Sequence, residues 1–134
     1  MTKGASQIES DFYLKLKPSL KKIIKGEVYR NGMRPINSKK EDAVVTYKSG
    51  LYGQFQDGEI MLNIYVPDRS YNKEYVKDYD RCMEIENKAI EIVSKLTDGE
   101  YLISLIETPI TIQEEAISQH YVNIRLKYKR VNYK

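Results

Sequence analysis

The chain has few of the residues from which metal and catalytic sites are usually built. It contains one cysteine, Cys82, and one histidine, His120, among 134 residues. A zinc site usually needs about four closely spaced Cys, His or carboxylate ligands. Cys82 and His120 do not meet this requirement, so the sequence predicts no metal site. A single cysteine cannot close an internal disulfide, which argues against a disulfide-stapled secreted domain.

Catalytic signatures are absent from the sequence as well. There is no Gly-Xaa-Ser-Xaa-Gly elbow, no phosphate-binding glycine-rich loop and no dinucleotide fingerprint. Cys82 lies on the apolar stripe of a predicted helix, where a thiol behaves as a small hydrophobe, and His120 is interpreted as an edge histidine. Most carboxylates are spaced as helix caps or as partners of lysines. The sequence therefore predicts no enzyme and no cofactor.

Long hydrophobic runs and a strong charge excess are also missing. No apolar run approaches the roughly 18 residues that span a membrane, and residues 1–7 lack the apolar core of a signal peptide. The net charge of +3, from 22 Lys and Arg against 19 Asp and Glu, is too small by itself to indicate nucleic-acid binding. We expect one domain over residues 1–134, disordered over 1–6, in the cytoplasm and without membrane contact.

Tyrosine is the residue type in excess. There are 12 Tyr, 2 Phe and no Trp, so most large rings carry a hydroxyl. Such rings suit half-buried positions and surfaces that a partner covers, because the ring packs while the hydroxyl finds a hydrogen bond. An A/T-biased genome explains the same excess, and composition does not separate the two interpretations.

The pattern of elements predicts an α+β fold with a mainly antiparallel sheet, in which a long central helix and an N-terminal helix pack on one face. The first helix begins near Gln7, and we expect Pro18 to end it near Leu16. The central helix is predicted over 78–96. Segment 69–77 is predicted to be a polar connection and 49–53 a turn. Strands are predicted over 27–30, 43–48, 55–66, 101–106, 110–116 and 120–131.

Two groups of basic residues stand out. One is the set of lysines on the first helix. The other is Arg125, Lys127 and Lys129, which share one face of the last strand, with Arg130 and Lys134 nearby. A basic strand face with tyrosines can hold single-stranded nucleic acid. It can equally be a protein contact or a strand edge that lysines protect from aggregation, and we favour these latter two interpretations.

Several phrases of the sequence resemble the tail-completion and tail-terminator proteins of tailed bacteriophages and prophages. They are an opening helix, a Gly-Glu-Val-Tyr strand at 26–29, the phrase Ile-Tyr-Val-Pro-Asp at 64–68, a helix after a polar loop, and the closing strand at 121–128. The resemblance covers about residues 8–131. It implies a non-enzymatic virion protein that forms a ring, often a hexamer, in the tail or neck after assembly in the host cytoplasm. The ring would stop tail-tube polymerisation and join head to tail, with genomic DNA passing through unbound.

A ring needs head-to-tail contacts between different surfaces of neighbouring subunits. The candidates are the loop at 33–42, the segment 71–79 and the exposed face of 120–131. Two rival hypotheses stay open: a nucleic-acid-binding module that uses the last strand, and a small-molecule domain or enzyme with a tyrosine-lined pocket closed by residues 67–79. The candidate interface residues are Arg34, Lys39, Lys40, Tyr71, Tyr75, Tyr79, Tyr121, Arg125, Lys127 and Lys129.

Overall fold

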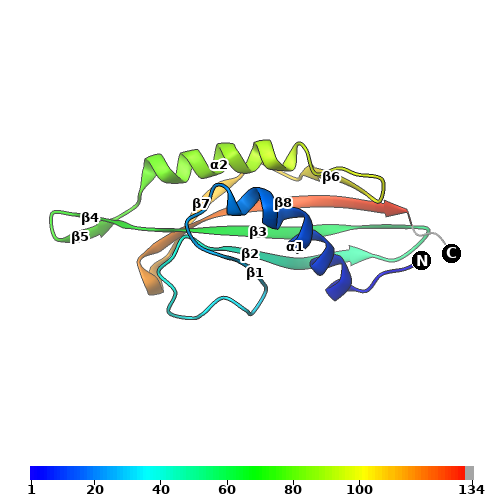
Figure 1. The fold of residues 1–134 in the computed structure, drawn as a ribbon, viewed down its shortest axis with the longest axis horizontal. Helices are drawn as coiled ribbons and strands as arrows, with labels where there is room; N and C mark the ends of the chain where they lie inside the picture. Colours follow the sequence, from blue (N-terminus) through cyan, green and yellow to red (C-terminus); the bar gives the residue numbers. More distant parts are fainter. Residues whose placement is uncertain (132–134) are drawn as a thin grey trace.

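The computed structural model describes residues 1–131 and has an α+β fold in which most strands pair antiparallel (Figure 1). The prediction of this fold class is confirmed. No helix within residues 1–131 is both long and apolar enough to cross a membrane. The elements are α1 (Ala5–Lys21), β1 (Val28–Arg30), β2 (Ala43–Leu51), β3 (Phe55–Pro67), β4 (Arg69–Tyr71), β5 (Glu74–Val76), α2 (Tyr79–Val93), β6 (Tyr101–Leu105), β7 (Ile110–Glu114), a 3-10 turn (Glu115–Ile117) and β8 (Gln119–Val131).

The main sheet is built around β3 and β8, which pair antiparallel over their full length. Its order is β1-β2-β3-β8-β6, and β7 also pairs with β8. Strand β6 pairs with residues 126–130 of β8 and β7 with residues 119–123, so both strands lie along the same edge of β8. The strand at 110–114 therefore pairs antiparallel with the last strand of the chain.

One pairing departs from the expected pattern, because β1 and β2 are parallel. Parallel neighbours need a connection long enough to carry the chain back to the same end of the sheet. Residues 31–42 provide that connection, seen as the long loop in Figure 1. The loop is therefore both a topological crossover and a candidate surface.

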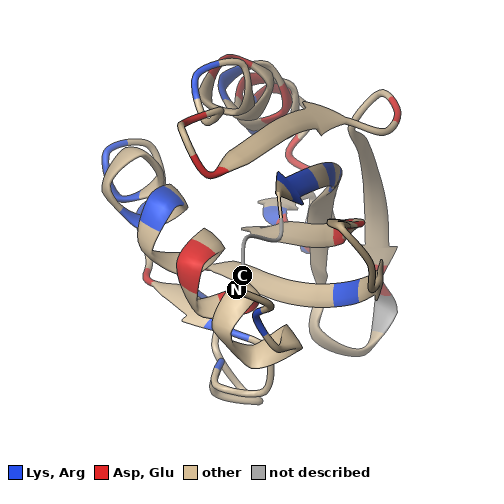
Figure 2. Cartoon of the chain, turned by 90° about the vertical axis from the view of Figure 1, so that its right-hand side faces the viewer, with Lys and Arg blue, Asp and Glu red and all other residues tan. Residues whose placement is uncertain are grey.

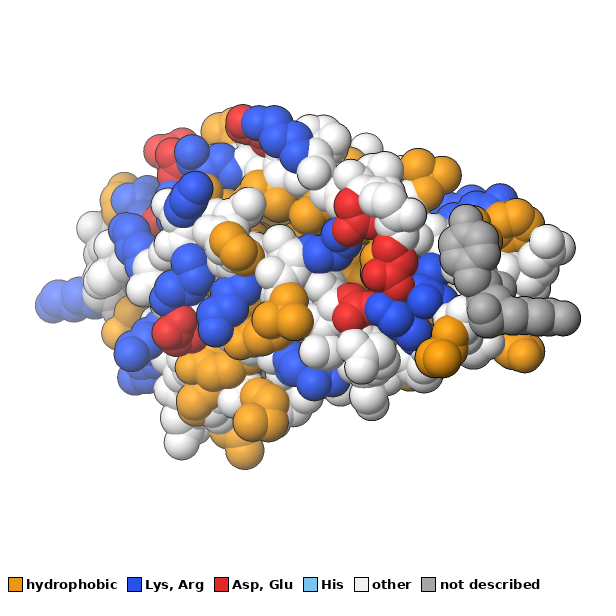
Figure 3. All heavy atoms as spheres, turned by 45° about the vertical axis from the view of Figure 1, so that its right-hand side comes forward, with side chains coloured by type: hydrophobic (Ala, Val, Ile, Leu, Met, Phe, Trp, Pro, Cys, Tyr) orange, Lys and Arg blue, Asp and Glu red, His pale blue; other side chains and the backbone are white. Residues whose placement is uncertain are grey.

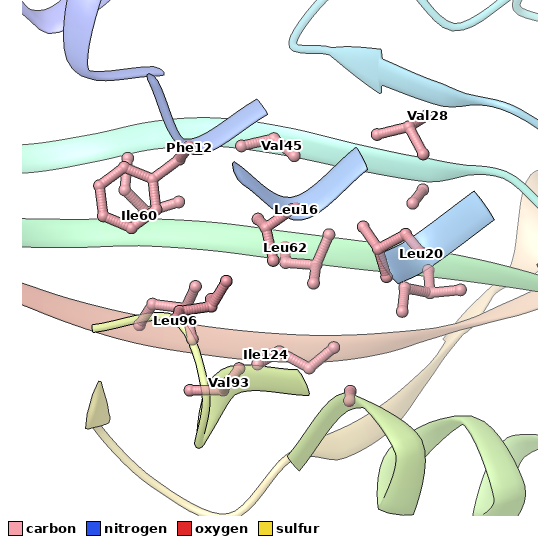
Figure 4. Close-up of a cluster of buried hydrophobic side chains, with 14 of the residues drawn as sticks. Phe12, Leu16, Leu20, Val28, Val45, Ile60, Leu62, Val93, Leu96 and Ile124 are labelled. Atoms are coloured by element: carbon pink, nitrogen blue, oxygen red, sulfur yellow. The ribbon is translucent and has the colours of Figure 1, made fainter. Parts of the chain in front are cut away.

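A single hydrophobic cluster contains buried residues of both helices and of the strands of the main sheet. In Figure 4, Phe12, Leu16 and Leu20 of α1 reach toward the side chains of β2 and β3, while Val93 approaches Ile124. Alternate apolar residues of β3 are buried, and burying each large apolar side chain contributes about 1.5–3 kcal/mol. They are Ile60, Leu62, Ile64 and Val66.

The predicted break of the first helix at Pro18 is wrong. Helix α1 continues through Pro18 to Lys21, with Leu16 and Leu20 buried on either side of it. An interior proline costs a helix about 3 kcal/mol, but the buried stripe that spans the proline offsets this cost, and Pro18 itself is exposed. Ala5 and Ser6, expected to be disordered, are also helical.

The N-terminal residues are held at one end of the sheet. The backbone N–H of Lys3 donates to Gln56 Oε1 (3.1 Å), and Arg130 Nη1 donates to the backbone oxygen of Met1 (2.6 Å). Lys3 Nζ also forms ion pairs with Asp11 and Glu100, both at 2.7 Å. Figure 2 shows the N-terminus at this end, with acidic and basic positions close to one another. These contacts attach residues 1–3 to the end of the sheet.

The central helix is shorter than predicted. Helix α2 has 15 residues and ends at Val93, so it is not the long helix that the 78–96 pattern indicated. Ser94 Oγ donates to the carbonyl of Glu91 (2.6 Å), a local bond that competes with the helical ladder. Lys95 and Leu96 then bond three residues back, in a tighter turn. Asp78 caps the start by accepting from the N–H of Arg81 (3.2 Å), in agreement with its predicted charge role.

Two segments predicted as connections contain strands. Strand β2 runs through the expected turn to Leu51, because Gly50 and Gly58 leave room for Tyr128; a Cβ on either glycine would lie 2.6 Å from the Tyr128 hydroxyl oxygen. The expected polar connection at 69–77 is a hairpin of β4 and β5. Short polar strands like these lack the apolar alternation by which strands are predicted.

Candidate functional site

The outward face of β3 and β8 carries the basic residues that the sequence singled out. Side chains of directly paired residues lie on the same face, so Lys127 and Lys129 share this face with Glu59 and Asp57. Arg125 belongs to the same row. Each predicted basic residue therefore lies beside an acidic one of β3, which the sequence did not indicate.

Arg125 is engaged by two carboxylates. Its Nε and Nη2 donate to the two oxygens of Glu59 (2.6 and 2.9 Å), and its Nη1 donates to Glu107 Oε1 (3.1 Å). The hydrogen bond from Arg125 lowers the pKa of Glu59 below its usual value. Lys127 and Lys129 remain exposed, with Lys129 Nζ 4.4 Å from the centre of the Phe55 ring. The face is thus mixed in charge rather than basic.

The same face also exposes apolar side chains. Leu102 pairs with Lys129, and Ile110 pairs with Asn123, so both side chains lie outward; they are 61% and 48% exposed. Leu51 pairs with Asp57 and is 75% exposed. Tyr121 is half-buried against Tyr65, with ring centroids 5.5 Å apart. Aliphatic side chains and tyrosine beside mixed charges are typical of a protein-contact surface.

The hairpin of β4 and β5 projects from the body of the molecule at the end opposite the N-terminus (Figure 1). Tyr71, Tyr75 and Tyr79 are all exposed here, at the hairpin and at the start of α2. The turn is made by Asn72 and Lys73, both with positive φ (49° and 67°). Left-handed backbone at a lysine is sterically unfavourable. Pro67 and Asp78, at the two ends of the 67–79 segment, line a pocket whose other lining residues include no tyrosine.

Arg34 is tied to the body instead of facing outward. Its side chain is 10% exposed. Nε donates to Asp42 Oδ2 and Nη2 to Gln119 Oε1, both at 3.0 Å, while the guanidinium lies 3.9 Å from the centre of the Tyr65 ring. Lys39 and Lys40, the other candidates in this loop, are exposed. The two lysines of the loop are therefore exposed, whereas Arg34 holds the loop to the body of the protein.

Two adjacent buried carboxylates hold the loop, and sequence reasoning missed both. Asp42 is fully buried and accepts from the N–H of Glu27 (2.8 Å), from Ser38 Oγ (2.6 Å) and from Arg34. Burial raises the pKa of Asp42, but these hydrogen bonds outweigh it and the pKa is lowered. Each carboxylate oxygen of Glu41 accepts a hydrogen bond from the Arg81 guanidinium, Oε2 from Nε at 2.9 Å and Oε1 from Nη2 at 2.6 Å.

Gly26 is the local signal that could have revealed this arrangement. A Cβ at this position would lie 2.1 Å from Asp42 Oδ1 and 2.5 Å from the carbonyl oxygen of Glu41. Only glycine allows the chain after α1 to approach the two carboxylates so closely. Glycine shortly after a helix is also common as a C-cap, a role in which the close approach is not visible.

Cys82 and His120 occupy separate environments. Cys82 is buried, and burial raises the pKa of its thiol to about 11, so the reactive thiolate is scarce at neutral pH. His120 Nδ1 lies 2.7 Å from Asp68 Oδ1. Across residues 1–131, no serine or cysteine side chain hydrogen bonds to His120. The same residues contain no group of three or more His, Cys, Asp or Glu side chains placed to hold a metal.

Comparison with known proteins assigns no family: no family model matches the chain, and no curated protein matches it. The candidate site is therefore defined by its geometry alone. It consists of the outer sheet face, with Arg125, Lys127, Lys129 and Tyr121, and the projecting hairpin, with Tyr71 and Tyr75. These two surfaces lie on different parts of the molecule (Figure 1).

Proposed function

We propose that the chain is a structural assembly protein that forms a ring, of the tail-terminator or tail-completion kind found at the head-proximal end of phage tails. Its partners are other copies of itself, in a ring that is often a hexamer in proteins of this kind, and the tail-tube and neck proteins. Genomic DNA passes through the ring without specific binding. On this proposal the protein is a virion component of the tail or neck, assembled in the host cytoplasm.

The observation that carries the proposal is the pair of distinct exposed surfaces. A closed ring uses head-to-tail contacts, in which one patch on a subunit meets a different patch on the next. The hairpin offers Tyr71 and Tyr75 at one end, and the outer sheet face offers Leu51, Leu102 and Ile110 beside mixed charges. Tyrosine is among the residues that supply most of the binding energy in many interfaces, and exposed aliphatic side chains add apolar area that a partner can bury.

The proposal treats the two helices as one layer that covers a single face of the sheet. The opposite face is then available to a neighbouring subunit. A nucleic-acid site on this face is less favoured, because Glu59 and Glu107 engage Arg125 and Asp57 lies beside Lys129. Polyanion binding by this strand would need lysines and arginines without such partners.

The test is assembly in solution. We expect the purified protein to be monomeric or weakly associated alone, and to form rings when mixed with its tail-tube or neck partner, as seen by analytical ultracentrifugation and negative-stain electron microscopy. A double change, Tyr71→Ser with Tyr75→Ser, should abolish the rings while leaving the circular dichroism spectrum unchanged. Tyr52→Ser, at an exposed tyrosine of the β2–β3 turn, is the matched control and should assemble normally.

Two outcomes would contradict the proposal. One is the absence of any complex with the tube or neck protein at micromolar concentrations. The other is assembly that survives the double tyrosine change, which would remove the hairpin from the contact. Salt-dependent retention on single-stranded DNA that is lost when Arg125, Lys127 and Lys129 become alanine would favour the nucleic-acid hypothesis instead.

A further inference from the structure

A groove runs between the two helices, on the side of the molecule away from the outer sheet face. Its volume is about 490 Å³, within the range of binding pockets. In Figure 3, hydrophobic side chains are visible in a hollow bordered by basic ones. The lining residues are Lys15, Ser19, Lys22 and Ile23 from α1 and its C-terminal turn, and Lys88, Glu91, Ile92, Lys95 and Leu96 from α2 and its C-terminal turn.

The groove has an apolar floor. Ile23 and Ile92 are half-buried and pack against the core, and Leu96 is buried at its edge. Half-buried isoleucines between two helices leave apolar surface in contact with water, which a partner's apolar side chains could cover at a gain of free energy. Two helix faces that contact only water would be expected to carry polar side chains at these positions instead.

The rim is basic on both sides. Four lysines line the groove against one carboxylate, Glu91. Lys15 is ion-paired with Asp98, and Lys95 Nζ lies 3.6 Å from Glu91. Lys22 and Lys88 are exposed and have no acidic partner among residues 1–131. The groove therefore carries unneutralised positive charge, in contrast to the outer sheet face.

The length of the groove can be estimated from the spacing of its lining residues along each helix. Lys15, Ser19 and Lys22 follow at intervals of four and three, as do Lys88, Ile92 and Lys95. Residues at such intervals lie on one face of a helix, and the seven positions span about 10 Å. Each helix, together with its C-terminal turn, thus presents about two turns to the groove, a length that matches about two turns of a docked helix.

We propose that this groove binds a short acidic amphipathic segment of a partner protein. Apolar side chains of the segment rest on Ile23, Ile92 and Leu96, and its carboxylates pair with Lys22 and Lys88. Helix-in-groove recognition uses this combination of apolar anchors and flanking charge. A nucleic-acid backbone would use the lysines but would leave the apolar floor uncovered. The proposal concerns a different surface from the ring contacts and does not depend on them.

The experiment uses a fluorescein-labelled synthetic peptide of about 14 residues, roughly 20 Å long as a helix, with leucines at helical spacing on one face and glutamates beside them. Fluorescence anisotropy with the full chain should show saturable binding, and a peptide of the same composition in scrambled order should bind at least about tenfold more weakly because its apolar face is lost.

Three variants separate the contributions. Lys22→Glu with Lys88→Glu should weaken peptide binding at least about tenfold, because both unpaired lysines become repulsive. Lys127→Glu with Lys129→Glu makes the same charge change on the outer sheet face, and binding should stay within about twofold. Ile92→Ala removes apolar surface from the groove without changing its charge, and it should weaken binding at least about threefold. Urea midpoints of all variants identify any loss of folding.

The proposal is overturned if the peptide does not bind, if the scrambled peptide binds equally well, or if both charge reversals weaken binding alike. It is also overturned if single-stranded DNA binds in place of the peptide, is lost in the Lys22→Glu, Lys88→Glu variant and is insensitive to Ile92→Ala. That result would assign the groove to polyanions in general. Ring assembly is measured separately and is unaffected by any of these outcomes.

Discussion

The loop at 33–42 and the β4–β5 hairpin are both connections that carry candidate interface residues, yet they are held in different ways. The loop is fastened by Asp42, Arg34 and Gln119, which form a buried network with the body of the sheet. The hairpin makes its ladder bonds between its own two strands and projects outward (Figure 1). The loop is therefore attached to the folded core by buried side chains, whereas the hairpin leaves Tyr71 and Tyr75 exposed.

This difference predicts that the same kind of substitution has very different costs in the two segments. Breaking a buried ion pair by removing one partner leaves the other charge without compensation. An exposed side chain on a projecting hairpin has little to lose, and surface substitutions usually change stability by less than about 0.5 kcal/mol. Stability measurements and assembly measurements should thus separate the two segments.

The largest expected effect is that of Asp42→Ala. It leaves the Arg34 guanidinium, 10% exposed, without its carboxylate, and it leaves the N–H of Glu27 without an acceptor. We expect the free energy of unfolding in urea to fall by about 3–5 kcal/mol. Glu74→Ala in the hairpin removes an exposed carboxylate and should cost less than about 0.5 kcal/mol. Equal costs at the two positions would remove the distinction between the segments.

A smaller effect is expected in the pH dependence of the stability that Asp42 contributes. The pKa of Asp42 is lowered from its ordinary value of 3.8, so its charge stabilises the native state above about pH 4 and this contribution is lost as the pH falls through the lowered pKa. The gap in unfolding free energy between the wild type and Asp42→Ala should therefore narrow between about pH 5 and pH 2.5. Urea titrations at several pH values measure the gap. A gap that stays constant to pH 2.5 would mean that Asp42 acts by shape and not by charge.

The parts of this fold that sequence could predict are those set by local periodicity. The strand predicted over 55–66 is present, and its Ile60, Leu62 and Ile64 are buried together because side chains of a strand point to opposite faces in turn. The exposed tyrosines of the hairpin were named as candidates by residue type alone. Both inferences depend only on neighbours within a few positions.

The features that sequence could not predict depend on tertiary proximity. Arg34 bonds Gln119, 85 positions away, and no local pattern connects the two. Pro18 stays within α1 because the packing of Leu16 and Leu20 outweighs a local rule. The acidic neighbours of Lys127 and Lys129 follow from the register of β3 against β8, which a sequence pattern alone leaves undetermined.

The smallest expected effect is at the hairpin turn. Lys73 has a φ of 67°, and the left-handed conformation costs a non-glycine residue roughly 1–2 kcal/mol. Lys73→Gly relieves that cost but adds the conformational entropy of glycine, so the net local gain should be below about 1 kcal/mol. Hydrogen exchange of the hairpin amides should slow by up to about fivefold. Glu74→Gly, at a position with ordinary backbone, should speed the same exchange.

The urea midpoint of the whole protein should not move in Lys73→Gly, because a hairpin that opens on its own contributes to local exchange without contributing to global unfolding. If the urea midpoint rises by an amount that corresponds to the same free energy as the slower exchange, the hairpin unfolds together with the sheet. The loop and the hairpin would then belong to one cooperative unit. In that case the tyrosines could not be changed without affecting the fold, and the assembly test would need variants at Leu102 and Ile110 of the outer face instead.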